Sequence, residues 1–212
     1  MRIRELLTAV VICLTAAGCT STSVGEPSAA DHPPSSRTTE PSATEPPADG
    51  LPADGAPRVA NPLDTTAYQR DPCQALNSEQ TRELALEDQG TVEEGDVGLI
   101  CEWRSLRGEP AGVDISSLDR NPYGLTGAYR AQKTGVLKLF EELPEVEGHP
   151  AVAYGRNDQR DAGVCAVLVG MTDQLTFEFA VRLSAANVGS VDPCEMAVQV
   201  AGMAVRNMKG DQ

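Results

Sequence analysis

The last third of the chain carries the clearest alternation of apolar and polar positions. Residues 164–169 are apolar on both faces, which predicts a central strand covered on both sides of a sheet. Residues 175–183 alternate with the period of a half-buried strand, and the turn at 170–173 makes the two strands a hairpin. A helical spacing closes the chain, with Met196, Ala197, Val200, Ala201, Ala204 and Met208 on one face.

A second hairpin is expected earlier in the chain. Residues 99–104 alternate as a strand does, and residues 113–116 form a second short strand. The connection at 106–112 contains a glycine and a proline, which favour a turn. These two strands should therefore be antiparallel neighbours.

The region between the two hairpins is less regular. Asn121 followed by Pro122 predicts the start of a helix that runs through Gln132, although its glycines weaken it. Residues 136–143 fit either a helix or a strand. The apolar run at 151–154 is short and is expected to be a strand.

Two stretches share one helix-start pattern, residues 71–74 (DPCQ) and residues 192–195 (DPCE). In each, an aspartate can accept hydrogen bonds from the first turn, a proline suits the first helical position, and Gln or Glu follows three residues after the aspartate. The first helix is expected to continue to about Asp88 or Gly90. The second pattern begins the closing helix.

These elements predict a single α+β domain over residues 66–212. Its antiparallel sheet should have about five strands, with an N-terminal and a C-terminal helix packed on it. A domain of roughly 140 residues can bury close to two-thirds of its unfolded surface, which is enough for one core.

The first 18 residues have the order of a cleaved export signal. Arg2 and Arg4 precede the apolar run 6–14, and small residues stand directly before Cys19. The run is much shorter than the ~20 residues that a membrane span needs. The segment resembles the lipobox of bacterial lipoproteins, which implies a diacylated Cys19; plain secretion is the alternative. The expected location is extracytoplasmic, on the outer face of the cell membrane, held there by the lipid.

Residues 19–65 are expected to form a disordered tether that begins at the lipidated cysteine. Nine of the fifteen prolines lie here, together with many Ser, Thr, Asp and Glu residues and no aromatic residue before position 66. Such a segment cannot bury enough apolar surface to offset the entropy of ordering. The same composition fits an O-glycosylated stalk.

Four of the six cysteines, Cys73, Cys101, Cys165 and Cys194, lie in the predicted domain. An even number in an exported domain predicts two disulfides, for which three pairings are possible. Cys73 with Cys194 and Cys101 with Cys165 is the preferred pairing, because it joins helix start to helix start and strand to strand. A zinc site is the competing interpretation, but the cysteines lack its close spacing and no metal is expected.

Catalytic patterns are weak. His149 is the domain's single histidine and stands between a glycine and a proline, as turn residues do. No Gly-x-Ser-x-Gly motif accompanies it. The acidic residues Glu141, Glu142, Glu145 and Glu147 are interpreted as a solvated face. No catalytic residue and no cofactor are predicted, and the formal net charge of −14 disfavours nucleic acid as a partner.

The order of these motifs resembles a known family. DPC at 71–73, Cys-Glu-Trp at 101–103, EGHPAV at 147–152, Cys165 in an apolar strand and DPC at 192–194 are similar to actinobacterial lipoproteins catalogued as domain of unknown function 3558. The resemblance implies an exported, lipid-anchored α+β domain and supplies no activity or catalytic residues.

Two function classes follow. The favoured one is a monomeric module at the outer membrane face that binds a small hydrophobic ligand or an envelope protein. The alternative is an extracytoplasmic hydrolase that uses His149 and an acidic residue. The ligand-binding residues are not predictable from the sequence.

Overall fold

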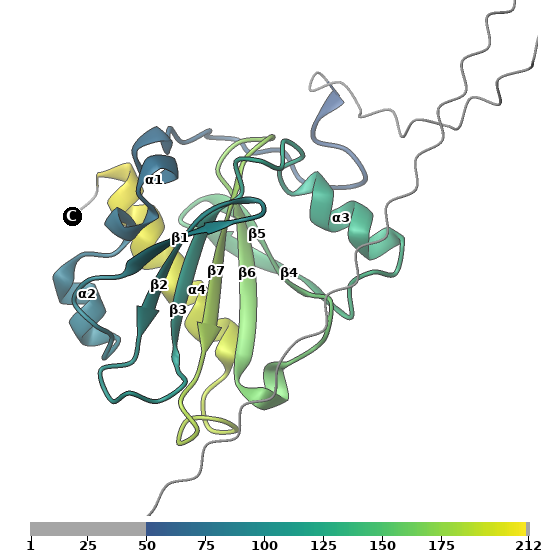
Figure 1. Ribbon diagram of the computed structural model, residues 1–212. Coiled ribbons are helices and arrows are strands. Elements are labelled where there is room, and N and C mark those ends of the chain that lie inside the picture. Colours follow the sequence, from purple (N-terminus) through teal and green to yellow (C-terminus); the bar gives the residue numbers. More distant parts are fainter. Residues whose placement is uncertain (1–49, 211–212) are drawn as a thin grey trace, which may run out of the picture. The chain divides into compact units, whose positions relative to one another are not determined.

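A seven-stranded antiparallel sheet organises residues 50–210, the part of the chain that the computed structural model describes (Figure 1). The strand order is β1-β2-β3-β7-β6-β5-β4. The strands are β1 (Thr91–Gly95), β2 (Gly98–Arg104), β3 (Gly112–Ser117), β4 (Leu139–Val146), β5 (His149–Gly155), β6 (Val164–Gly170) and β7 (Thr176–Arg182). The helices are α1 (Thr66–Arg70), α2 (Ser78–Glu83), α3 (Thr126–Lys133) and α4 (Pro193–Lys209), with 3-10 turns η2 (Pro72–Ala75) and η3 (Arg160–Ala162).

The expected α+β class is confirmed, but the sheet has seven strands where about five were expected. The two additional strands are the edges of the sheet: β1 was not expected, and β4 overlaps residues 136–143, which fitted either a helix or a strand. In β1 four of the five residues are exposed, so no apolar alternation marks it. In β4 the pairing shifts between Leu143 and Val146, around Pro144, and edge strands are where a proline and a bulge are tolerated.

Helix α4 covers one face of the sheet, behind the strands in Figure 1. The predicted start is confirmed, because the Asp192 carboxylate accepts hydrogen bonds from the amides of Cys194 (2.7 Å) and Glu195 (3.1 Å), and Pro193 takes the first position. Its apolar face packs on β6 and β7, where Phe177 and Phe179 are fully buried. This layer is the main core.

The opposite face is covered only in part, by α3 (Figure 1) and by Ala56 from the segment before α1. Leu125 and Tyr129 pack there on Val152 of β5 and Leu168 of β6. The helix begins at Thr126, later than the predicted start after Asn121 and Pro122. The intervening residues form a turn in which Gly124 has φ +52°, and a Cβ there would lie 2.4 Å from the Asp173 carbonyl oxygen.

The first predicted helix is two short helices. Asp71 caps η2 as expected, accepting from the Cys73 amide at 3.1 Å, but Leu76 is extended and ends the turn. Asn77 then starts α2 through a reciprocal cap with Gln80, in which the Asn77 side chain accepts from the Gln80 amide and the Gln80 side chain accepts from the Asn77 amide. A continuous helix to residue 88 or 90 was the wrong expectation, because a second start signal lies inside it.

The two disulfides exist, but the preferred pairing is wrong. Cys73 bonds Cys101 (Cα–Cα 5.1 Å) and Cys165 bonds Cys194 (Cα–Cα 5.0 Å). The turn η2 lies beside the C-terminal end of α4, where the Asn207 side-chain amide donates to the Ala75 carbonyl oxygen at 2.8 Å. Cys194 lies at the other end of that helix, about 20 Å away at 1.5 Å per residue. Each helix start is therefore bonded to the strand beneath it.

Residues 50–65, here called the strap, lie on the domain and not in a free tether. Leu51 and Val59 are buried, with 8% and 5% of their surface exposed. The Val59 amide donates to the Asp173 carboxylate at 2.9 Å, and the Ala53 amide donates to the Thr126 hydroxyl at 3.0 Å. The folded unit thus begins before residue 66. The predicted signal, Cys19 and the rest of the tether lie outside the described residues.

Candidate functional site

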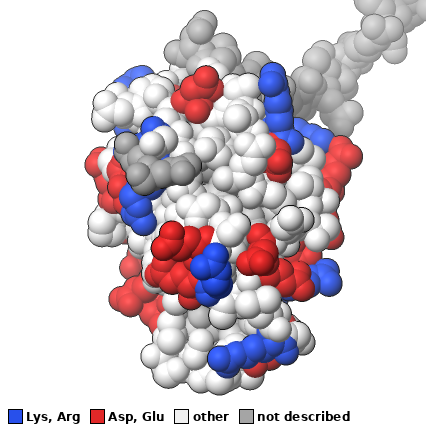
Figure 2. Space-filling view, turned by 90° about the vertical axis from the view of Figure 1, so that its left-hand side faces the viewer, with Lys and Arg blue, Asp and Glu red and all other residues white. Residues whose placement is uncertain are grey.

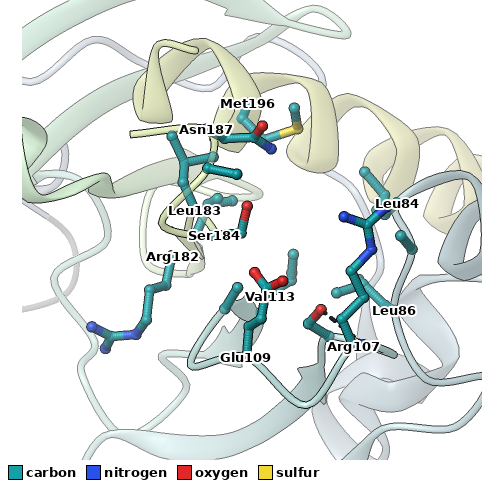
Figure 3. A pocket seen from close by; sticks show the side chains of 16 residues that line it. Leu84, Leu86, Arg107, Glu109, Val113, Arg182, Leu183, Ser184, Asn187 and Met196 are labelled. Carbon is teal, nitrogen blue, oxygen red and sulfur yellow. Dashed lines mark hydrogen bonds between the residues drawn. The ribbon is translucent and has the colours of Figure 1, made fainter. Parts of the chain in front are cut away.

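A pocket of about 260 Å³ lies at one end of the sheet, where the N-terminal end of α4 meets the β2–β3 hairpin (Figure 3). We call it the end pocket. Its walls come from the segment that follows α2 (residues 84–86), from β3, from β7 and from the first turn of α4. The apolar lining residues are Leu84, Leu86, Val113, Val181, Leu183 and Met196. Apolar side chains from four separate chain segments therefore converge without filling the space between them.

Charged side chains stand at the mouth of the end pocket. Glu109 points from the hairpin loop into the cavity, whereas Arg182 points away from it (Figure 3). The Arg107 side chain runs along the wall toward Leu84, and its backbone amide donates to the Ser105 hydroxyl at 3.3 Å. Among the described residues, the Glu109 carboxylate has no hydrogen bond or ion pair. The mouth thus presents an unpaired acceptor to whatever enters.

A second hollow of about 630 Å³ adjoins the end pocket. It lies on the face of the sheet opposite α4, which we call the open face. The two share Glu109 and Arg182, and Glu102, Arg104 and Asp114 line the second. Arg104 is already paired with Glu102 at 3.1 Å. This hollow is charged where the end pocket is apolar.

In the second hollow, the carboxyl group of Asp114 has a raised pKa. The pKa of its carboxyl is raised to about 6, mainly by burial and also by the nearby Glu102 carboxylate, while Arg182 opposes the shift. Asp114 faces Glu102 directly across the β2–β3 ladder. The strand pairing therefore sets two carboxylates side by side.

A further polar pair lies in the middle of the open face. The Tyr154 hydroxyl of β5 donates to the Glu178 carboxylate of β7, reaching over the intervening strand β6. Ala166 is the β6 residue opposite Tyr154, and its small side chain leaves room for the contact. Burial raises the pKa of both groups. The hydrogen bond satisfies both partners, so the pair stabilises the sheet.

The structure does not support His149 as a catalytic base. It is the first residue of β5, only 1% exposed, and its Nδ1 donates to the Gly170 carbonyl oxygen at 3.1 Å. Burial lowers the pKa of its ring. The prediction of a turn residue was also wrong, because the turn itself is formed by Glu147 and Gly148, both at positive φ. The ring is therefore buried away from any substrate in solution.

Three of the four glutamates in residues 141–147 have separate partners. Glu141 pairs with Arg160 at 3.5 Å, and Glu142 accepts from the Tyr129 hydroxyl at 2.8 Å. Glu147 pairs with Arg206 of α4. Within residues 50–210, no three Asp, Glu, His or Cys residues are grouped as metal ligands would be.

Acidic side chains are frequent on the side of the domain formed by α1, α2 and β1 (Figure 2). Glu93 and Glu94 are exposed on β1, and Arg120 pairs with Glu94 at 2.6 Å. Together with the chain's net charge of −14, this surface favours cations over anions as they approach.

The sequence did not identify the end pocket. The loop at residues 106–112 was recognised as a hairpin connection, but Arg107 and Glu109 carry no motif. Two charged residues next to the exposed Leu106 are the signal that could have suggested a functional loop. The apolar walls could not be separated from ordinary core residues by their periodicity.

Comparisons with known proteins give one informative result. A family model described as a protein of unknown function (DUF3558) matches residues 14–207. No curated protein and no solved structure is significantly similar to the chain.

The two disulfides indicate an oxidising, extracytoplasmic environment. Among the described helices, none has the length and apolar character that a membrane span requires.

Proposed function

The chain belongs to the DUF3558 family, and from this premise we propose that it is an exported lipoprotein that binds a small, partly apolar ligand in the end pocket. The lipid on Cys19 would hold the protein to the outer face of the cell membrane. The domain would then present its pocket outside the cytoplasm. The observation that carries the proposal is an apolar cavity whose mouth has an unpaired carboxylate.

The proposal of a lipid anchor rests on the first residues of the chain. Basic residues, a short apolar run and small residues precede Cys19 in the order of a lipoprotein signal. The disulfides agree with export. One acyl chain gives only marginal membrane binding, so two chains on the modified cysteine would be needed for a stable anchor.

Metabolic labelling with a palmitate analogue tests the anchor. The protein should incorporate label, and Cys19→Ala should remove the label and release the protein into the medium. Cys13→Ala is the matched control and should keep the label. Incorporation of label by the Cys19→Ala variant would refute Cys19 as the lipidated residue.

The proposal of ligand binding rests on the form of the end pocket. Ligand sites are concave, mostly apolar and equipped with few polar groups that orient the ligand. The walls of the end pocket are apolar and include Leu84 and Met196. Glu109, Ser184 and Asn187 supply polar atoms to its lining. Its volume of about 260 Å³ suits a small molecule or one end of a larger one.

A bulkier side chain in the wall of the end pocket tests the proposal of ligand binding. Met196→Trp adds volume to the wall and should reduce binding of 1-hexanol, a neutral apolar probe, at least fivefold in an NMR titration. Gln199→Trp places the same residue on an exposed position of α4 and should leave binding unchanged. If Met196→Trp binds hexanol as tightly as the unmodified protein does, the end pocket is not the ligand site.

A further inference from the structure

The charge distribution at the mouth of the end pocket indicates what kind of ligand the pocket takes. Three charged side chains line it, Arg107, Glu109 and Arg182. Arg182 points away from the cavity and the Arg107 side chain follows the wall, so Glu109 is the labelled charged group that points inward (Figure 3). The Glu109 carboxylate therefore presents a negative charge to the interior of the cavity.

The Glu109 carboxylate is available for a ligand. It is partly buried, and in residues 50–210 it forms neither an ion pair nor a side-chain hydrogen bond. Its neighbours in the adjoining hollow include Glu102 and Asp114, while Arg104 there is already paired with Glu102. A partly buried carboxylate gains most from a partner that carries positive charge and donates hydrogen bonds.

The walls restrict the form of that cation. None of the lining residues of the end pocket is aromatic. Quaternary ammonium groups have no hydrogen-bond donor and are bound by aromatic cages. A primary ammonium group donates three hydrogen bonds. The Glu109 carboxylate and the Ser184 hydroxyl can accept hydrogen bonds from such a group. The Ser184 side chain forms no other hydrogen bond among the described residues.

We infer that the end pocket binds a primary amine with an apolar body, the ammonium group contacting Glu109 and the apolar part lying against Leu86, Val113 and Met196. This inference rests on the proposed ligand-binding function and specifies its ligand class. A terminal amine of a larger molecule has the same chemistry as a free alkylamine.

Three probes of equal chain length test the inference by NMR titration of the folded protein: hexylammonium, hexyltrimethylammonium and 1-hexanol. Hexylammonium should bind three- to tenfold more tightly than hexanol, and the trimethylated probe no more tightly than hexanol. Glu109→Gln should abolish the preference for hexylammonium, measured as the ratio of the Kd values of hexanol and hexylammonium. Glu83→Gln, an exposed carboxylate near the pocket but not in its lining, is the control and should keep the preference.

The outcomes separate the two proposals. If hexanol binds and hexylammonium binds equally well, or if the preference survives in Glu109→Gln, the amine inference fails and the apolar pocket stands. If none of the three probes binds, the proposed ligand-binding function itself fails. Tighter binding of the trimethylated probe than of hexylammonium would also overturn the assignment of a primary amine.

Discussion

Asp114 shows how a single residue of the open face makes the domain sensitive to pH. Its pKa is raised to about 6 by burial and by the Glu102 carboxylate. Folding therefore favours the protonated carboxyl, and the favourable contribution is complete below about pH 4, where the unfolded chain is protonated as well. It decreases as the pH rises from about 4 to 6 and is absent above that range.

We expect Asp114→Asn to stabilise the domain at neutral pH. A shift of about two pKa units corresponds to at most about 3 kcal/mol, and partial exposure reduces this to about 1–2 kcal/mol. The free energy of unfolding at pH 7.5 should increase by that amount, whereas at pH 4 the variant and the parent should be nearly equal. Urea unfolding at the two pH values measures both.

Asp119→Asn is the matched control, because Asp119 is exposed two residues beyond the end of β3. It should change the stability by less than about 0.5 kcal/mol at either pH. Equal stabilisation by Asp114→Asn at pH 4 and pH 7.5 would contradict the assigned role of its charge.

Individual residues differ in how far the sequence reveals them. Asp192 was predicted as a helix cap because its hydrogen bonds are local, to amides two and three residues away. Glu109 was not predicted as a site residue, because its position matters only once α4 and β7 have been brought to the hairpin. Asp114 was predicted only as part of a strand, since its neighbour Glu102 becomes adjacent through strand pairing.

Among the elements, the strap contributes to the core although its prolines suggested a tether. Val59 and Leu51 bury apolar surface, and Arg58 pairs with Asp173 at 2.6 Å. Composition predicted disorder because disorder is judged from the average of a segment. A few apolar residues at the right positions are enough to order this one.

Removing the strap should destabilise the domain. A chain that begins at residue 66 is expected to lose about 2–4 kcal/mol of unfolding free energy relative to a chain that begins at residue 50, since the buried side chains contribute about 1.5–3 kcal/mol each before the ordering entropy is subtracted. Chemical denaturation of both chains measures the difference. Val59→Ala in the longer chain should account for about 1–2 kcal/mol, and equal stability of the two chains would show that the strap is not part of the fold.

The disulfides connect elements that are close in sequence, with separations of 28 and 29 residues. On the chain-entropy account, a loop of this length contributes about 3–4 kcal/mol. Replacing Cys73 and Cys101 together by serine should cost about that much and leave no free thiol. Replacing Cys165 and Cys194 together should do the same.

Thiol titration distinguishes this connectivity from the one preferred on sequence grounds. Had Cys73 been bonded to Cys194, the Cys73→Ser, Cys101→Ser variant would expose two free thiols, on Cys165 and Cys194. Peptide mapping without reduction gives an independent answer, as the peptides of Cys73 and Cys101 should travel together.

At the scale of the whole molecule, the sequence predicted the central layers and missed the periphery. Strands β6 and β7 and helix α4 were predicted because their burial imposes periodicity on every residue. The edge strands β1 and β4 and the short helices near the N-terminus have weak patterns, since much of their surface faces solvent. The end pocket lies at this periphery, which is why the sequence could establish the fold class and not the site.

The strap and the end pocket lie at opposite ends of the strands. The strap contacts Asp173 and Met171 in the β6–β7 turn, whereas the pocket is built around Gly112 and Arg182, where β3 begins and β7 ends. No residue of the strap lines the end pocket, so a ligand can enter the pocket without displacing the strap.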